Sequence, residues 1–432
     1  MKRLHIIALL FGALMVARSL STQVIEPVEI EIRRSQTPLS ETPSKELAAI
    51  DSLMWQQPDS ALAVLLDCFA RRDTLNVSPL NVSPLNMSPE SESDNLQRRK
   101  HCVSTTEYDR HYAHLLLAEL LYKNDYEQTN REELLQAVFY FDSIMQVPEP
   151  VKGPSFIRNV FLAARAHYIN GVGYYERDSV VEACKEYLKT LEMMEDHFEE
   201  KELVGHRARF LAYTYNRLGD LFSEQFMMES AITCYENALV YCRIEPISPI
   251  GVSNILYRIG KQYDKKNEIE KAISYYSKAL ENMTVTDNMV YRDIVASKAL
   301  CDYKTGVAAE VSVDRITRVL LQAKTDNERL NRYLTIGGIY FSEGNYDSAI
   351  FYLEPVFENR EVGLQDQAAN YLYIVYDKLG DKELSDSLVH YLTNRKKLVG
   401  ENKALVSRLE DMYKNHSNQK LKTQAEVERK NP

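Results

Sequence analysis

The stretch that decides the fold reads Leu218-Gly219-Asp220-Leu221-Phe222 and continues as Ala231-Ile232-Thr233-Cys234-Tyr235. The same order of small and aromatic residues returns as Ile259-Gly260-x-x-Tyr263 with Ala272-Ile273-x-x-Tyr276. Further copies are Ile336-Gly337-x-x-Tyr340 with Ala349-Ile350-x-x-Leu353, and, more weakly, Gly171-x-x-Tyr174 with Ala183-Cys184-x-x-Tyr187. Residues three and four apart share one face of a helix. Each copy therefore predicts two packed helices, and the repetition predicts an array of such pairs.

The small residues of each copy have a packing role. Glycine inside a helix costs about 0.5–1 kcal/mol relative to alanine, so a repeated glycine needs a compensating reason. At Gly219, Gly260 and Gly337 a side chain would hold the neighbouring helix away. Tyr235 and Tyr276 are expected to fill the gap to the next pair.

This order of small and large residues resembles the tetratricopeptide repeat over roughly residues 110–395. The resemblance implies an all-α fold, a right-handed superhelical solenoid of antiparallel helix pairs. Less regular pairs are expected at 108–145, 290–323 and 366–392. A degenerate first pair is expected at 45–75, and the array proper at 105–395.

The amino terminus has the pattern of a secretory signal peptide. Lys2-Arg3 precede an apolar run to Ala17, and Ala17-Arg18-Ser19 offers small residues at a cleavage site. We therefore expect a signal peptide at 1–19 and a flexible tether at 20–44, with an uncleaved membrane anchor as the alternative. The expected location is the periplasm or outside the cell.

Two further segments depart from the repeat. Residues 76–90 repeat Asn-Val-Ser-Pro-Leu, and such frequent proline prevents a helix, so 76–104 is expected to be a disordered loop. Residues 396–432 are expected to form a C-terminal helix with a basic tail that frays beyond Tyr413. This tail, or an uncleaved amino terminus, is where any membrane contact would occur. A solvated helix face is the plainer interpretation.

Composition and motifs argue against nucleic-acid binding and catalysis. The formal net charge is −10, which does not favour a nucleic-acid surface. The histidines are scattered, and no phosphate loop, dinucleotide fingerprint or nucleophile elbow is present. We therefore expect no enzyme activity, no catalytic residue, no cofactor and no metal site. Cys184 and Cys234 stand beside packing positions and are expected to be buried thiols.

The candidate site residues come from the register of the first helices in each pair. Positions that face the groove of a tetratricopeptide array are expected to hold Tyr168, Tyr175, Asn216, Asp220, Tyr257, Lys261 and Asn370. Tyrosine, asparagine and aspartate suit a protein or peptide partner, because they offer stacking surface and hydrogen bonds. Ordinary solvated or inter-helix roles are the alternative. The lysine–asparagine clamp that some family members use for a carboxyl terminus is absent at Tyr168, Val172, Asn216 and Asp220.

The layout also resembles a group of signal-bearing tetratricopeptide proteins of Bacteroidetes. The resemblance rests on Ile50-Asp51-Ser52-Leu53, on His114-Leu115-Leu116-Leu117-Ala118 and on the helix around Arg395–Tyr413. It implies an envelope sensor or adaptor, but no membrane span or output domain follows here before Pro432. The leading expectation is a non-enzymatic interaction scaffold of the bacterial cell envelope. The alternative is the sensor portion of a signalling protein whose membrane and output parts are missing or lie on another chain.

Overall fold

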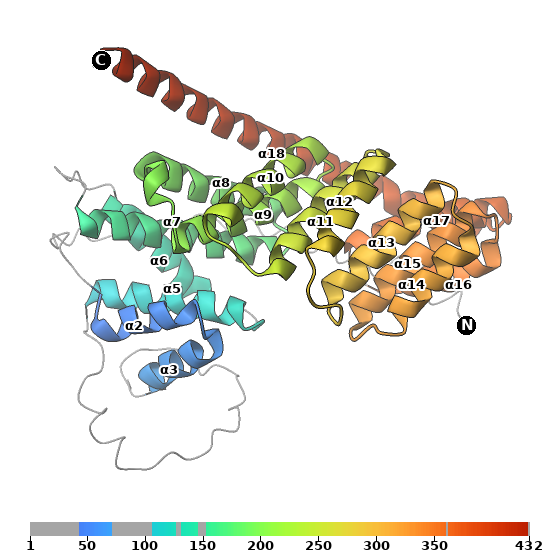
Figure 1. The fold of residues 1–432 in the computed structure, drawn as a ribbon, viewed down its shortest axis with the longest axis horizontal. Helices are drawn as coiled ribbons and strands as arrows, with labels where there is room; N and C mark the ends of the chain where they lie inside the picture. The colour runs from blue at the N-terminus through green and yellow to red at the C-terminus, as the bar shows by residue number, and fades with distance from the viewer. Residues whose placement is uncertain (1–42, 71–105, 127–130, 146–152, 360–361, 431–432) are drawn as a thin grey trace, which may run out of the picture. The chain divides into compact units, whose positions relative to one another are not determined.

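A computed structural model describes residues 43–70, 106–126, 131–145, 153–359 and 362–430 (Figure 1). The expected signal peptide (1–19), the expected tether up to residue 42 and the expected loop (76–104) lie outside these ranges. Every regular element in the described ranges is a helix, and the helices pack as a tetratricopeptide-like solenoid. The all-α solenoid expected from the repeat is therefore confirmed.

The helices follow the chain in pairs. They are α2 (Lys45–Met54), α3 (Pro58–Ala70), α5 (Glu107–Lys123), α6 (Arg131–Met145), α7 (Pro154–Tyr175), α8 (Val180–His197), the 3-10 turn η1 (Glu200–Glu202), α9 (His206–Glu224), α10 (Met228–Ile244), α11 (Pro249–Lys265), α12 (Ile269–Glu281), α13 (Met289–Lys304), α14 (Ala309–Leu320), α15 (Asp326–Ser342), α16 (Tyr346–Glu358), α17 (Val362–Lys378) and α18 (Lys382–Lys430). They divide into two compact units. The larger unit holds α9 to α17 and the first part of α18, within Val204–Arg408. The smaller unit holds α2 to α8 and η1, together with α18 from Leu409 onward.

A close contact between a glycine and a large side chain, a tyrosine ring in three pairs and Leu353 in the fourth, joins the two helices of each regular pair. A β-carbon on Gly219 of α9 would lie 2.6 Å from the Tyr235 ring of α10, and one on Gly260 would lie 2.5 Å from the Tyr276 ring. The corresponding distances are 2.8 Å for Gly171 and Tyr187, and 2.6 Å for Gly337 and Leu353. Carbon atoms normally approach no closer than about 3.5 Å. The packing role predicted for these glycines is confirmed.

The expectation that Tyr235 and Tyr276 fill the gap to the next pair is only partly correct. Each ring lies on the glycine of its own pair. The Tyr235 hydroxyl donates to Asp220, also within its own pair, at 2.8 Å. The Tyr276 ring does reach the next pair, where it packs with Ile294 and Cys301 of α13. These rings therefore hold a pair together first and connect neighbouring pairs second.

The turns between first and second helices share one backbone design. A residue with left-handed backbone ends the first helix, and the next N–H donates to the carbonyl five residues earlier. Met227 donates to Phe222 at 2.9 Å, for example, and Glu268 to Tyr263 at 2.9 Å. The left-handed residues are Asp125, Asp178, Phe226, Asn267, Gly306, Gly344 and Gly380. This Schellman arrangement satisfies carbonyls that the helix end would otherwise leave without partners.

The smaller unit is organised around a buried guanidinium. Arg165 of α7 is 1% exposed, and its Nη atoms donate to Asp51 of α2 at 2.8 and 2.9 Å. Its Nε donates to Glu119 of α5 at 2.8 Å, and the Tyr112 hydroxyl donates to Asp51 at 2.5 Å. Burial raises the pKa of Asp51, but the charge and hydrogen bonds of Arg165 outweigh burial and hold that pKa below its usual value. One side chain thus joins α2, α5 and α7.

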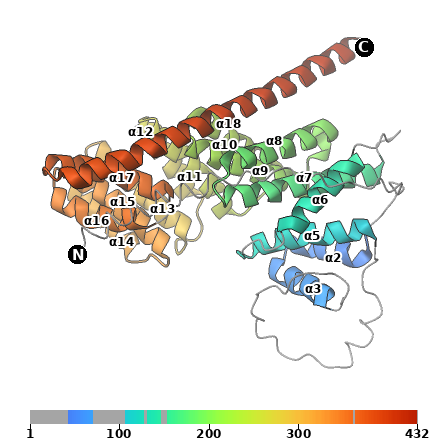
Figure 2. The same cartoon turned by 180° about the vertical axis from the view of Figure 1, so that it is seen from behind.

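The helix α18 is continuous across residue 395, so the second helix of the last pair and the C-terminal helix are one element. In the larger unit its Leu384, Leu388 and Tyr391 complete a core formed with α15, α16 and α17 (Figure 2). Tyr391 also donates to Asp366 of α17 at 2.7 Å. The start of α18 therefore belongs to the array.

The tail beyond Tyr413, which the sequence predicts to fray, is helical to Lys430 in the structure. Polar contacts with the end of α8, inside the smaller unit, explain the difference. Tyr413 donates to Glu195 at 2.5 Å, and the His416 ring lies 3.0 Å from Asp196. Such contacts between helices leave no trace in the apolar pattern of α18 alone.

Replacing Gly260 by alanine should lower the free energy of unfolding by about 1–3 kcal/mol, because the new methyl group overpacks the contact with Tyr276. Gly400 provides the matched control, since a β-carbon there meets no atom within 4 Å. Gly400→Ala should raise the free energy of unfolding by about 0.5–1 kcal/mol through helix propensity. Urea denaturation of both variants measures the difference, and two changes of the same sign would contradict the packing account.

Replacing Asp51 by asparagine should destabilise the smaller unit by about 3 kcal/mol, because it leaves the buried Arg165 with one carboxylate fewer. Trp55, the only tryptophan of the chain, reports the change, since its ring lies 5.8 Å from the Arg165 guanidinium. Its fluorescence during urea denaturation gives the free energy of unfolding. The exposed Asp59 of α3 supplies the control, and Asp59→Asn should cost less than about 1 kcal/mol. Equal losses for the two variants would contradict a special role for Asp51.

Candidate functional site

The first helices of the pairs in the larger unit follow one another directly. α11 contacts α13, α13 contacts α15, and α15 contacts α17. Within the described ranges, no contact of similar extent joins α10 to α12, α12 to α14 or α14 to α16. In a curved stack of repeats the helices that approach most closely line the inner side. The first helices therefore form the inner face of the larger unit, and this face is the candidate partner-binding surface.

Polar side chains connect the first helices from α9 to α15 across the inner face. These connections are Asp220 with Arg258 between α9 and α11, Tyr257 with Ser297 at 3.3 Å and Asp264 with Lys304 at 2.5 Å between α11 and α13, and Tyr303 with Glu343 at 2.5 Å between α13 and α15. The row fixes the spacing of the helices while leaving aromatic and charged groups at the surface. An extended peptide could therefore meet rings, donors and acceptors in alternation.

The middle of the row concentrates these groups. Lys261 is exposed, and its Nζ lies 5.6 Å from the centre of the Tyr257 ring. Asp293 of α13 stands in the field of Lys261 and Arg332. Burial nevertheless raises the pKa of Asp293 above its usual value, because desolvation outweighs the two positive charges. The Tyr257 ring, the Lys261 ammonium and the Asp293 carboxyl group, whose pKa is raised, thus lie in the same part of the inner face.

The residues predicted for the larger unit all lie on first helices, but they differ in what they can offer. Tyr257 and Lys261 are brought together as described. Asp220 is buried and already bound to Arg258 and Tyr235. Asn370 is exposed on α17, where its side chain donates to the carbonyl of Asp366 at 2.7 Å. Asn216 is half-buried. Tyr257 and Lys261 are therefore the strongest candidates.

The two predicted residues of the smaller unit lie on α7. Tyr168 is 8% exposed, and its ring centre lies 5.9 Å from that of Tyr187 on α8. The Tyr168 ring packs between the helices of its own pair, so little of it is exposed to a partner, and its groove role stays a prediction. Tyr175 is half-buried at the end of the same helix.

Sequence register missed the partners that complete the inner face. Arg258 follows the predicted Tyr257, and Ser297 lies on α13, where no groove residue was predicted; the pairing of both depends on how far one helix pair is rotated against the next. Lys265, whose Nζ donates to the Ser223 hydroxyl at 2.8 Å, was missed for the same reason. All three residues lie on first helices, close to the side that faces the groove, and that placement is the signal that could have identified them.

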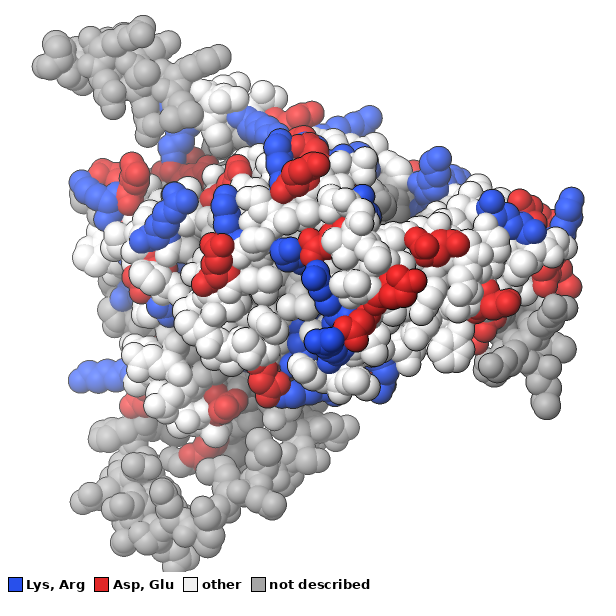
Figure 3. Space-filling view, turned by 45° about the vertical axis from the view of Figure 1, so that its right-hand side comes forward, with Lys and Arg blue, Asp and Glu red and all other residues white. Residues whose placement is uncertain are grey.

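The described part of the chain offers little to a metal ion or a bilayer. It holds no cluster of three or more His, Cys, Asp or Glu side chains suited to a metal. None of its helices combines the length and the apolar character that a membrane crossing requires. On the face shown in Figure 3, acidic and basic side chains alternate over the surface.

The buried cysteines are free thiols. Cys184, Cys234, Cys242 and Cys301 are buried, which confirms the burial predicted for Cys184 and Cys234. Burial, aided by the charge of Glu410, raises the pKa of Cys184 to about 12. Burial, aided by Asp264, raises the pKa of Cys301 to about 12 as well. Thiols of this kind are poor nucleophiles at neutral pH.

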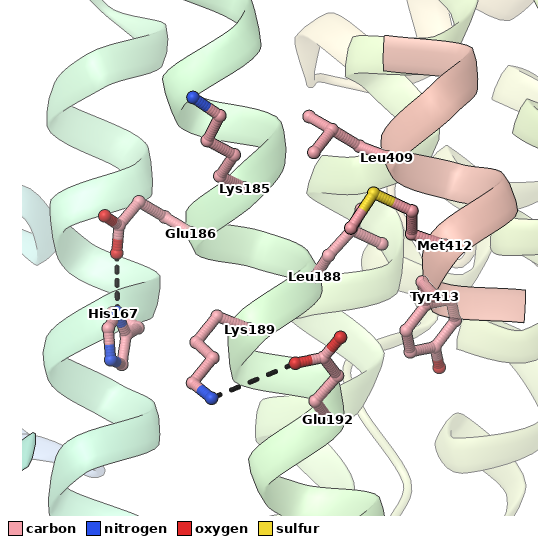
Figure 4. Close-up of a pocket in the computed structure, with 9 residues that line it drawn as sticks. All are labelled: His167, Lys185, Glu186, Leu188, Lys189, Glu192, Leu409, Met412 and Tyr413. Atoms are coloured by element: carbon pink, nitrogen blue, oxygen red, sulfur yellow. Dashed lines mark hydrogen bonds and ion pairs between the residues drawn. The ribbon is translucent and has the colours of Figure 1, made fainter. Parts of the chain in front are cut away.

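A pocket of about 360 Å³ lies in the smaller unit between α8 and the part of α18 from Leu409 to Tyr413 (Figure 4). Leu188, Leu409 and Met412 give it an apolar wall. Its acidic side chains already have partners, since Glu186 contacts His167 and Glu192 lies 3.9 Å from Lys189. The pocket therefore offers shape more than unsatisfied polar groups, and we assign it no ligand.

His167 joins three helices at the edge of this pocket. Its Nδ1 lies 2.6 Å from Glu186 of α8, and its Nε2 lies 3.0 Å from Asp142 of α6. Burial lowers the pKa of His167, but hydrogen bonds to the two carboxylates outweigh burial and raise that pKa to about 9. His111 of α5 behaves in the opposite way. Burial, with the charge of Arg110, lowers its pKa to about 4.

These two histidines should give the smaller unit a stability optimum near neutral pH. The unfolded-state pKa of histidine is about 6.5. The contribution of His167 is complete below that value and is lost as pH rises through about 9. The contribution of His111 is complete above about 6.5 and is lost as pH falls toward 4. Thermal unfolding followed by Trp55 fluorescence should therefore show His167→Gln flattening only the alkaline decline. Loss of the acidic decline instead would reverse the assignment.

Comparisons with known proteins agree with the fold and the repeat. Residues 212–239, 253–282 and 330–359 match the family model of the tetratricopeptide repeat. No curated protein matches the sequence.

Solved structures of similar shape share little sequence with the chain. NprR in complex with its cognate peptide NprX is 16% identical with a TM-score of 0.52, covering 75% of this chain and 91% of that one. The apo form of RapI is 12% identical with a TM-score of 0.51, covering 88% and 98%. A Rap protein complexed with Competence and Sporulation Factor is 14% identical with a TM-score of 0.50, covering 87% and 98%. At these identities the likeness concerns the fold. The chain therefore carries tetratricopeptide repeats within a longer tetratricopeptide-like solenoid.

Proposed function

We propose that the protein is a non-enzymatic scaffold of the bacterial cell envelope that binds a protein or peptide partner along the inner face of its larger unit. The observation that carries the proposal is that the repeated residues pack the helices together, whereas residues that vary between repeats face the surface. The repeated glycines, alanines and rings are consumed by packing, whereas Lys261 is exposed on the inner face beside the half-buried ring of Tyr257, which itself also packs on Tyr276. Side chains that packing does not need are free to serve recognition.

The location within the envelope rests on the sequence. The basic start and apolar run at Lys2–Ala17 favour export. Fractionation of cells that express the full chain tests this part, with recovery from the cytosol as the contrary outcome. A partner would then be another exported protein or peptide.

A sensor role is the second candidate. NprR and a Rap protein share the fold, and those structures are complexes with a cognate peptide and with Competence and Sporulation Factor. In a sensor role the inner face would bind a separate signalling peptide. The response would then come from another protein. A short peptide recovered from the complex would favour the sensor role over a scaffold for folded partners.

Affinity capture from an envelope extract tests the surface directly. The full chain should retain a partner that Tyr257→Ala with Lys261→Glu loses by at least about tenfold, because both changes remove contacts at the inner face. Tyr275 and Lys278 of α12 supply a matched control, since that lysine Nζ lies 5.0 Å from the centre of that ring on a second helix. Tyr275→Ala with Lys278→Glu should retain the partner. Equal retention by both double variants would exclude the inner face as the binding surface.

A further inference from the structure

Phe226 stands apart from the other residues that end first helices. The equivalent left-handed positions in the described turns hold aspartate, asparagine or glycine. Phe226 has φ of 54°, a backbone conformation that bulky side chains seldom adopt. Such a residue raises the free energy of the folded state relative to glycine at the same position. The turn after α9 therefore retains a side chain that its backbone disfavours.

Packing does not compensate for this strain. The Phe226 side chain is 56% exposed, so most of its ring lies in solvent. A glycine would satisfy the same turn without strain, as Gly306 and Gly344 do in the turns after α13 and α15. Strained residues of this kind persist where the side chain has a role outside folding. The ring of Phe226 is thus available to a partner.

Lysines gather around the same turn. The Lys265 Nζ lies 5.9 Å from the centre of the Phe226 ring and donates to the Ser223 carbonyl at 3.1 Å. The Lys403 Nζ of α18, also within the larger unit, donates to the Phe226 carbonyl at 3.0 Å. Lys261 lies one helical turn before Lys265. Three positive charges therefore lie around the exposed ring of Phe226.

These three lysines differ from most others in the larger unit. Lys266 and Lys304, for example, lie within ion-pair distance of carboxylates. Across the part of the chain that the structure describes, Lys261, Lys265 and Lys403 have no carboxylate within ion-pair distance, although the charges of Asp293 and Glu224 act on Lys261 and Lys265 from further away. Burial, together with the charge of Lys261, lowers the pKa of Lys265 to about 8, and Glu224 offsets this only in part. An added carboxylate would therefore gain a charge partner here.

We propose that the Phe226 turn and its three lysines form a docking point for an acidic segment of the partner that carries an apolar side chain. The apolar side chain would pack on the Phe226 ring, and flanking carboxylates would pair with Lys265, Lys403 and Lys261. Charge complementarity selects this partner, because the positive cluster stands out on a chain of net charge −10. The ring adds specificity for apolar groups over purely acidic segments.

This inference rests on the proposed function, since Lys261 belongs to the inner face that would hold the rest of the partner. It specifies that the bound segment is acidic and carries an apolar side chain, and that one end of this segment lies at the Phe226 turn.

A synthetic probe tests the chemistry with the full chain. The probe is a fluorescein-labelled acidic octapeptide with Leu-Phe at its centre and Glu and Asp on both sides, measured by fluorescence anisotropy. Control peptides carry Ser-Ser at the centre or Gln in place of every acidic residue. We expect the probe to bind at least about tenfold more tightly than either control, and more weakly as salt screens the lysines. Equal binding of the probe and the uncharged control would overturn the proposal.

The decisive variant is Phe226→Gly, because it removes the ring while relieving the backbone. It should bind the probe about tenfold more weakly and unfold at the same or a higher temperature. Phe351→Ala is the matched control, since Phe351 on α16 is 68% exposed and lies on a second helix. It should bind the probe as the unaltered chain does. Unchanged probe binding by Phe226→Gly, or a lower unfolding temperature, would overturn the docking role.

The outcomes also separate this inference from the proposed function. If Tyr257→Ala with Lys261→Glu abolishes partner capture while Phe226→Gly affects neither capture nor the probe, the inner face stands and the docking point does not. If Phe226→Gly weakens the probe while the Tyr257 variant captures normally, the docking point stands and the inner-face assignment fails.

Discussion

The contact between a glycine of one helix and a ring of the next sets the distance on which the larger unit depends. With a β-carbon at Gly260 the Tyr276 ring could not lie where it does, and the pair would open. The same ring reaches Ile294 and Cys301 of the following pair, so an error in one pair would pass to its neighbour. Packing consumes these positions, and the polar pairs of the inner face fix the spacing between first helices. Folding and recognition therefore share the inner face, where the exposed Lys261 lies beside the half-buried Tyr257.

Much of the fold could be predicted from the sequence because the packing code is local. Gly219, Ala231 and Tyr235 stand at helical spacings that reveal both helices and their contact. Degenerate pairs such as α13 and α14 remained visible through their apolar periodicity, although they lack the glycine. The extent of α18 could not be predicted in the same way. Its last turns rely on Tyr413 and His416 meeting the end of α8, and pairs so distant in sequence have no periodic signature.

The candidate site was less predictable, for a geometric reason. Register places Tyr168 and Tyr257 at equivalent positions, and each ring packs on the tyrosine of its own second helix, yet Tyr168 is buried whereas Tyr257 is half-buried beside the exposed Lys261. A small rotation of a helix about its axis decides between these outcomes, and side-chain spacing does not encode it. Arg165 illustrates the same limit, because Asp51, Glu119 and Arg165 converge only once three helices have packed. Comparing turns across pairs was more informative, since Phe226 differs there from every described counterpart.

The weakly acidic thiols would have a consequence in an oxidising compartment, such as the one that the proposed export would reach. Oxidation and disulfide exchange proceed through the thiolate, which is scarce at a group whose pKa lies near 12. Cys184 in the smaller unit and Cys301 in the larger one would therefore stay reduced in an oxidising compartment for as long as each unit remains closed. An alkylating reagent would reach them only during opening. The rate at which Cys184 is alkylated would therefore measure how often the smaller unit opens. The rate at Cys301 would measure the same for the larger unit.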